Sequence, residues 1–296
     1  MNTPNEKINV FTVPGRPART LGQIGDLLIE AGIITPQDAE RISQLQRDRK
    51  LRFGDAAIKL GLVSHADIEQ ILSRQFGFPY LIPGQSPLSG ELVAAYAPFD
   101  PRVETFRALR SHCMQKWFRL DLRLKHLAIV SPHREEGRSY LAANLAVVFS
   151  QLGERTLLID ADMRNSRQHQ IFNLRNKAGL STLLAERAGE EVIERIAFLE
   201  GLSVLPSGPV PPNPQELLGR AVFQNFVARL DSEFDVVIID TPASEGSADV
   251  QAIVNRACGA LMVVRKHHTS VRAAKSLVNN LQGMGATFMG AVINAI

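Results

Sequence analysis

The sequence has few cysteines, few aromatic residues and no long hydrophobic run. Its two cysteines, Cys113 and Cys258, lack the spacing of a metal site, so we interpret them as buried thiols in a reducing compartment. No stretch reaches the roughly 18 consecutive apolar residues of a membrane span, and the N-terminus has no basic-then-apolar signal pattern. We therefore expect a cytoplasmic protein, peripheral at the inner membrane only through a partner.

The excess of positive over negative charge is also small. The net charge is +3, with 21% charged residues, and no run of five or six basic residues forms an arm for nucleic acid. We therefore expect no nucleic-acid partner. With 296 residues, the chain is long enough for one large domain and a smaller module.

An internal repeat is present in the first part of the chain. The stretch from Ile24 to Gln46 returns from Phe53 to Gln75, and each copy has the pattern helix, glycine, turn, helix. Each second helix opens on a Thr or Ser followed three residues later by Asp, which predicts an N-cap. We therefore predict a flexible N-terminus over 1–18 and a small all-α module over 19–80.

A linker and an α/β domain are predicted after the module. Residues 81–102 contain four prolines and two glycines, which is linker composition. From 103 to 296, short apolar runs alternate with helical stretches, which favours a doubly wound, mostly parallel sheet. The predicted strands are Leu127–Val130, Thr156–Asp160, Leu202–Leu205, Val236–Asp240, Ala260–Val264 and Ala291–Asn294.

A candidate phosphate-binding loop follows the first of these strands. The segment PHREEGRS, residues 132–139, partly matches the P-loop pattern G-x-x-x-x-G-K-[ST]. Gly137 and Ser139 fit, whereas Arg138 stands in place of the lysine. By itself this match is weak, and a strand, a charged turn and a helix would be the favoured explanation.

Carboxylates at the ends of two other strands strengthen the nucleotide-site interpretation. Asp160 and Asp162 end the second strand, and Asp240 ends a later one. The carboxyl ends of parallel strands meet at one edge of the sheet, so these side chains are expected to face the loop. A phosphate cradle beside a hydroxyl and carboxylates is what phosphoryl transfer needs.

From about residue 103 onward, the chain resembles the bacterial P-loop tyrosine kinases of exopolysaccharide synthesis. The N-terminal module is similar to the cyclic di-GMP-binding domain of secretion and pilus ATPases. The kinase-like segments are VETFRALR, GRSYLAANLA, LLIDADMRNSRQHQIF, GLSTLL, LPSGPVPPNPQELLG, FDVVIIDTP and GAVINA.

The kinase resemblance implies ATP and Mg²⁺ as cofactors and assigns a role to each matching residue. Ser139, Asp162 and Asp240 would hold the metal, directly or through water. Asp160, with Asp162 and Arg138, would act in catalysis. The implied nucleotide-binding residues are Ser131, Glu136, Gly137, Arg138, Ser139, Tyr140, Asp240 and Asn294, the last of these near the base.

Several departures from the family leave other functions open. Besides Arg138, Glu135 replaces the glycine usual in these kinases. Their C-terminal tyrosine cluster is not found, since the only tyrosines are Tyr80, Tyr96 and Tyr140. The alternative is a non-catalytic, nucleotide-dependent scaffold that gates polysaccharide assembly. A partition-type ATPase would carry a lysine where His133 stands.

The resemblance also implies partners. Glu104, Arg107 and Arg110 form E-x-x-R-x-x-R on one helix face, which in these kinases contacts the next subunit. Local ion pairs on a solvated helix are the simpler explanation. We expect a homo-oligomer that works with a membrane-embedded chain-length regulator.

The module resemblance implies cyclic di-GMP as a possible ligand. Gln23 stands where the first half of such domains has arginine, and it offers weaker contacts to guanine than Arg52 in the second half. A protein-docking module without ligand is the alternative. The implied ligand residues are Gln23, Gly25, Gly32, Gln46, Arg52, Gly54, Gly61 and Gln75.

Overall fold

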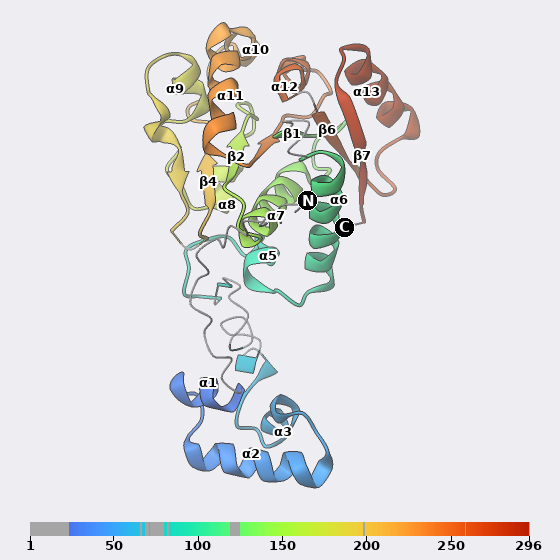
Figure 1. Cartoon of the computed structure of the whole chain (residues 1–296). Helices are drawn as coiled ribbons and strands as arrows, with labels where there is room; N and C mark the ends of the chain where they lie inside the picture. Colours follow the sequence, from blue (N-terminus) through green and yellow to red (C-terminus); the bar gives the residue numbers. More distant parts are fainter. Residues whose placement is uncertain are drawn as a thin grey trace, which may run out of the picture. The chain divides into compact units, whose positions relative to one another are not determined.

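The computed structural model divides the chain into two compact units, 1–77 and 78–296 (Figure 1). The predicted flexible N-terminus and Cys258 lie outside the described residues. The structure describes residues 24–65, 67–68, 71, 80–81, 83–118, 125–197, 199–257 and 259–295.

The smaller unit is helical, as the repeat predicts. It contains α1 (Ile24–Glu30), α2 (Pro36–Arg49) and α3 (Phe53–Lys59), and residues 65, 67, 68 and 71 are also helical. Leu28 and Ile42 are fully buried between these helices. The rest of the predicted fourth helix lies outside the described residues.

Both copies of the repeat use the same helix cap. Thr35 Oγ1 accepts a hydrogen bond from the Asp38 N–H (3.2 Å), while Asp38 Oδ2 accepts one from the Thr35 N–H (3.1 Å). Ser64 and Asp67 repeat this reciprocal arrangement at 3.2 and 2.7 Å. The predicted N-caps are therefore confirmed, and the capping boxes fix where each second helix begins.

The larger unit is built on a seven-stranded sheet with the order β3-β4-β2-β5-β1-β6-β7. Every pair is parallel except β3 with β4, so the predicted mostly parallel sheet is confirmed. All six predicted strands are present. The two-residue β3 was not predicted, because so short an edge strand has no periodicity to detect. The strands are β1 (His126–Val130), β2 (Thr156–Asp160), β3 (Glu194–Arg195), β4 (Leu202–Leu205), β5 (Val236–Asp240), β6 (Gly259–Arg265) and β7 (Thr287–Asn294).

Helices cover both faces of this sheet (Figure 1). Successive strand residues alternate between two cores: Leu127 and Ile129 pack on the α7 side, and Ala128 and Val130 on the opposite side. This explains why the strands are apolar without interruption. The helices are α5 (Val93–Tyr96), α6 (Pro101–Lys116), α7 (Arg138–Gln151), α8 (Gln168–Ile171), α9 (Leu180–Leu184), η1 (Glu190–Val192), α10 (Pro214–Gly219), α11 (Ala221–Glu233), α12 (Asp249–Ala257) and α13 (Val271–Gly283).

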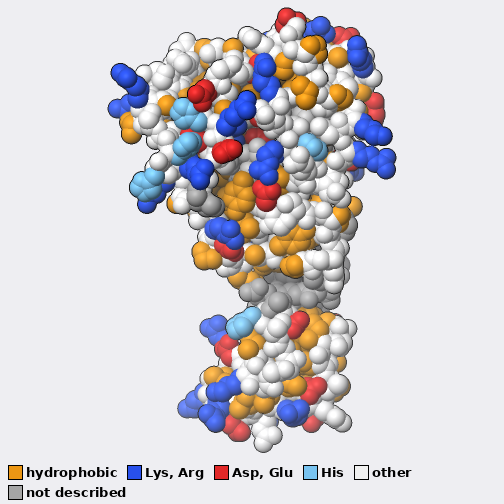
Figure 2. Space-filling view, turned by 180° about the vertical axis from the view of Figure 1, so that it is seen from behind, with side chains coloured by type: hydrophobic (Ala, Val, Ile, Leu, Met, Phe, Trp, Pro, Cys, Tyr) orange, Lys and Arg blue, Asp and Glu red, His pale blue; other side chains and the backbone are white. Residues whose placement is uncertain are grey.

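The surface charges and the helix lengths can be compared with two expectations from the sequence, namely no basic surface for nucleic acid and no membrane span. On the face shown in Figure 2, basic and acidic side chains are interspersed rather than gathered by sign. Within the part of the chain that the structure describes, no helix has both the length and the apolar character to cross a bilayer.

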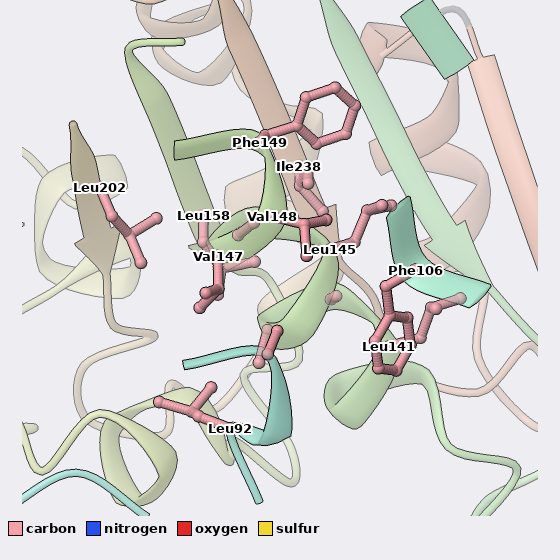
Figure 3. Packing of buried hydrophobic residues seen from close by; sticks show 14 of the residues in the cluster. Leu92, Phe106, Leu141, Leu145, Val147, Val148, Phe149, Leu158, Leu202 and Ile238 are labelled. Atoms are coloured by element: carbon pink, nitrogen blue, oxygen red, sulfur yellow. The ribbon is translucent and has the colours of Figure 1, made fainter. Parts of the chain in front are cut away.

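The segment predicted as a linker, 81–102, contributes to the core of the larger unit. Leu92 and Ala94 are fully buried, and Leu92 lies near the α7 side chains in Figure 3. Asn144 of α7 accepts a hydrogen bond from the Ala94 N–H (3.0 Å) and donates one to the Glu91 carbonyl (2.9 Å). Residues 88–97, which we call the strap, are therefore packed on α7. Proline content could not reveal this, because it reports local turns and not tertiary contacts.

Trp117, at the end of α6, fixes this helix on the sheet. The indole is buried, and its Nε1 donates a hydrogen bond to the His126 carbonyl at 2.9 Å. The ring lies so close to Gly259 that a Cβ there would be 2.1 Å from Trp117 Cζ2. Glycine at 259 is therefore required by a close approach of ring and backbone.

Substitution Gly259→Ala tests this contact. We expect it to lower the free energy of unfolding by about 1–3 kcal/mol, because the ring must move to make room for the methyl group. Gly283→Ala is the control, since a Cβ there meets no atom within 4 Å. Chemical denaturation of both variants measures the difference, and equal stabilities would contradict the packing argument.

Candidate functional site

The loop between β1 and α7 has the backbone of a phosphate cradle. Gly137, at the N-terminus of α7, has φ 96°, and a Cβ there would lie 2.5 Å from Asn294 Nδ2. Glu135 also has positive φ, 58°. Glycine adopts this backbone conformation without strain, whereas other residues rarely do. Glutamate at position 135, where these kinases usually have glycine, is therefore held in an unfavourable backbone conformation.

The first turn of α7 offers unpaired donors. Among the described residues, no hydrogen bond is formed by the backbone N–H groups from Glu135 to Ser139. At a helix N-terminus such groups have no intrahelical partner and favour an anion. The loop can therefore bind phosphate oxygens through its backbone.

Glu136 and Ser131 stabilise the loop from within. The Glu136 carboxylate is fully buried, and it accepts hydrogen bonds from the His133 N–H (2.9 Å) and the Thr269 hydroxyl. The Ser131 hydroxyl donates to the His133 carbonyl at 2.7 Å. Both were predicted to bind nucleotide, but their side chains are used to shape the loop.

Arg138 is buried and turned toward the protein. Its Nε donates to the Thr241 carbonyl (2.9 Å), and its Nη1 donates to the His133 carbonyl (2.7 Å) and to the Ser131 hydroxyl. Its Nη2 lies 4.0 Å from Asp162 Oδ2. The guanidinium thus joins the loop to the end of β5, and of its three nitrogens only Nη2 has no hydrogen bond to the loop or to β5.

Asp160 and Asp162 order the segment after β2. Asp160 accepts hydrogen bonds from the N–H groups of Asp162 (3.2 Å), Arg167 (3.1 Å) and Gln168 (3.0 Å). Asp162 Oδ1 accepts one from Asn165 N–H at 2.8 Å. These bonds hold the two carboxylates at the edge of the sheet where the phosphate loop begins.

Asp240, at the end of β5, completes the group. It is fully buried, and its Oδ2 accepts a hydrogen bond from Gln168 Nε2 at 2.8 Å. The Ser139 side chain lies close enough to lower the pKa of this carboxyl. Gln168 was not assigned a role from the sequence, although it lies within the kinase-like segment LLIDADMRNSRQHQIF.

Burial shifts the acidity of these groups. Desolvation raises the pKa of Asp240 to about 6, although the Arg138 charge lowers it. Desolvation and the neighbouring Asp240 raise the pKa of Asp160 well above its ordinary value. Loss of water is the larger effect, so each group binds a proton more readily than a free carboxyl does.

The arrangement fits a magnesium ion. Asp240 Oδ1 and Gln168 Oε1 are buried without a hydrogen-bond partner. Ser139 supplies a hydroxyl beside Asp240, and Asp162 is a second carboxylate. Oxygen ligands of this kind, completed by water and phosphate, suit Mg²⁺.

A cavity of about 250 Å³ lies next to the loop, lined by Gly137, Tyr140 and Asn294 together with Phe106, Val292 and Ile293. Asn294 Nδ2 donates to the Glu136 carbonyl at 3.1 Å. The predicted residues Tyr140 and Asn294 are therefore brought together in a largely apolar space beside the phosphate cradle.

The residues predicted for subunit contact are engaged within the chain. Arg107 forms an ion pair with Glu104 and donates a hydrogen bond to Tyr80 Oη at 3.0 Å. Arg110 donates to the Val148 carbonyl at 2.7 Å. Of the three, Glu104 is the most open, with 67% of its side chain exposed.

The smaller unit contains a separate cavity of about 710 Å³. Its lining includes matching residues of the two repeat copies, and four of them were predicted to bind cyclic di-GMP: Gly25, Gln46, Arg52 and Gly54. Gly32 and Gly61 do not line it. Their φ angles of 68° and 67° show that they end helices, as the sequence also predicted. Gln23 and Gln75 lie outside the described residues.

Comparison with known proteins identifies the family of the larger unit. A family model described as an AAA domain matches residues 135–289, more than half of the chain. The tyrosine-protein kinase YwqD of Bacillus subtilis (strain 168) is 34% identical over 209 residues, which cover 71% of this chain and 87% of that protein. The chain belongs to the family of bacterial tyrosine-protein kinases.

Solved structures of this family agree. The chimerical protein CapA2B2 matches with a TM-score of 0.66 and 34% identity, over 77% of this chain and 99% of that one. The kinase domain of the Escherichia coli tyrosine kinase ETK matches with a TM-score of 0.65 and 28% identity, over 69% and 80%. The predicted kinase family and P-loop fold are confirmed.

Asp240→Asn tests the electrostatic cost of the site. Folding raises the carboxyl pKa from 3.8 to about 6, so the folded state holds the proton more tightly and wild-type stability falls as pH rises through that range. We expect the nucleotide-free variant to be more stable by on the order of 3 kcal/mol at pH 7.5, and by about half as much at pH 5. Denaturation at both pH values measures this, and a pH-independent difference would contradict it.

Proposed function

We propose that this chain binds Mg-ATP at the phosphate loop and transfers the γ-phosphoryl group to tyrosine. The observation that carries the proposal is the cluster of Asp160, Asp162 and Asp240 beside Ser139 and the free N–H groups of the loop. Membership of the tyrosine-protein kinase family supports it.

Each group has a distinct role in this proposal. The loop N–H groups bind phosphate oxygens, and Ser139, Asp162 and Asp240 hold Mg²⁺, which neutralises phosphate charge when bound. Asp160, with its raised pKa, accepts the phenolic proton. Arg138 offers Nη2 to a phosphate oxygen, while its other nitrogens keep the loop closed on β5.

The adjoining cavity suits the base of the nucleotide. Its walls are mainly apolar, and Asn294 supplies an amide at the edge nearest the phosphate loop. A flat base can bury its faces against Val292 and Phe106 while the amide contacts its polar edge.

Family membership supports a role in exopolysaccharide biosynthesis, with a membrane-embedded chain-length regulator and self-association through α6. The exposed Glu104 carboxylate is the group best placed for a neighbouring subunit. Arg107 and Arg110 would first have to leave their present partners.

Calorimetry with Mg-ATP and Mg-ADP tests the nucleotide site. We expect Ser139→Ala and Asp162→Ala to weaken binding at least ~10-fold, which corresponds to about 1.4 kcal/mol. Ser150→Ala, in the last turn of the same helix, is the control, because its hydroxyl donates to the Val147 carbonyl. Unchanged affinity in both site variants would remove the assignment.

Phosphotransfer to a tyrosine peptide, measured with the same proteins, separates a kinase from a nucleotide-dependent scaffold. Arg138→Lys should change turnover more than affinity, because an ammonium group leaves the loop and approaches the phosphates as a point charge. Tight binding without transfer in either form would favour the scaffold.

We further propose that the cavity of the smaller unit binds cyclic di-GMP. Gly25 and Gly54, Asp26 and Asp55, and Ile29 and Ile58 are equivalent residues of the two copies, and all line this cavity. A lining built from two similar halves suits a ligand that itself has two equal halves. Arg52 contributes a guanidinium that can stack on guanine or bind phosphate.

Titration of the full chain with cyclic di-GMP tests this proposal. We expect micromolar binding that Arg52→Ala abolishes and Gln23→Arg tightens. Arg41→Ala is the control, since Arg41 pairs with Asp38 and does not line the cavity. No binding at millimolar ligand, by wild type and by Gln23→Arg, would indicate a protein-docking module.

A further inference from the structure

The three tyrosines of the chain differ in how their hydroxyl groups are held. Tyr96 Oη donates to the Leu88 carbonyl at 2.8 Å within the strap. The Tyr140 hydroxyl is buried, and its ring packs against Phe106. Tyr80 is only partly buried, and its Oη accepts a hydrogen bond from Arg107 Nη2 at 3.0 Å. Of the three, Tyr80 alone has a hydroxyl hydrogen-bonded to a guanidinium group, whereas the buried Tyr140 hydroxyl lies near Arg102 without such a bond.

On the helix beside Tyr80, the positive charge of the arginines is only partly neutralised by acidic side chains. Arg107 and Arg110 are one turn apart on α6, and Arg110 is half-buried. Burial lowers the pKa of Arg110, and the Arg107 charge lowers it further. Glu104 is the carboxylate paired with Arg107, and it is mostly exposed. An additional anion at this place would relieve the repulsion between the two guanidinium groups.

We propose that Tyr80 is a phosphorylation site of this chain and that Arg107 holds the resulting phosphate. The proposal rests on the kinase function above. Tyr80 Oη attacks the γ-phosphorus of ATP bound to a second copy, and the bond to the β–γ bridging oxygen breaks. ADP leaves, and the phenolic proton passes to Asp160 of the donor copy.

The geometry around Tyr80 suits a phosphate. Phosphotyrosine adds about −1.5 to −2 charges and three acceptor oxygens at neutral pH. Arg107 already reaches the hydroxyl, and Glu104 can turn into solvent when the phosphate replaces it as partner. Charge-assisted, bidentate bonds from arginine are the stronger class of hydrogen bond.

The position of Tyr80 gives the modification a consequence. It lies just after the boundary between the two units, at residues 77 and 78. The next residue, Leu81, donates its N–H to the Ala95 carbonyl of the strap at 2.8 Å. A phosphate held by α6 therefore fixes the start of the larger unit against the helix proposed for self-association.

Mass spectrometry of the full-length protein after incubation with Mg-ATP tests the site. We expect phosphate on the peptide that contains Tyr80, its loss in Tyr80→Phe, and its retention in Tyr96→Phe. When Tyr80→Phe protein is mixed with Asp162→Asn protein, phosphate should appear on the Asp162→Asn chain. A tyrosine peptide added to each reaction reports kinase activity independently.

The outcomes separate this inference from the proposed function. Phosphorylation of the added peptide without phosphate on Tyr80 overturns the inference and leaves the kinase function standing. No transfer to either overturns both. Transfer to Tyr80 within one chain, with none in the mixture, overturns the role of a second copy.

Removal of the phosphate by an added tyrosine phosphatase tests the role of Arg107. Phospho-Tyr80 should lose its phosphate about tenfold faster in Arg107→Ala than in wild type, because the phosphate is no longer held on α6. Lys116→Ala, in the last turn of the same helix, should leave the rate unchanged. Equal rates in all three proteins overturn the role of Arg107.

Discussion

The burial of three carboxylates at one edge of a parallel sheet is the constraint on which the nucleotide site depends. Asp160, Asp162 and Asp240 are almost entirely removed from water. Buried like charges are costly unless they are hydrogen-bonded or paired. Backbone N–H groups satisfy Asp160, whereas Asp240 keeps an oxygen without a partner. The fold therefore stores unfavourable electrostatic energy that a cation and its phosphate ligand would release.

Arg138 offsets part of this unfavourable electrostatic energy. A lysine at the same position would carry a compact charge on a flexible chain, whereas the planar guanidinium spans the loop and β5 and lies near Asp162. The site thus contains an internal cation that partly compensates the carboxylates. With two of its three nitrogens bound to protein oxygens, the guanidinium is suited to closing the loop as well as to contacting phosphate.

The strap gives the site a physical connection to the N-terminal side of the chain. Asn144, on the helix that begins at the phosphate loop, binds the strap backbone at Glu91 and Ala94. The Glu91 carboxylate in turn pairs with Arg167, whose own N–H binds Asp160. Through these contacts, phosphorylation of Tyr80 can shift the conformation of the phosphate loop, provided that the phosphorylated and unphosphorylated states differ in these bonds.

The sequence by itself determined the elements: six strands, the capping boxes, the helix-ending glycines, and Ser139, Asp160, Asp162 and Asp240 at strand and loop ends. These depend on local periodicity, capping chemistry and the rule that parallel strands share one carboxyl edge. Tertiary structure alone decided that Arg138 faces the protein, that Glu136 shapes the loop, that Gln168 joins the site and that the strap is core. Each of those depends on which distant groups fill the remaining hydrogen-bonding positions, such as the Thr241 carbonyl for Arg138, and no local pattern encodes this.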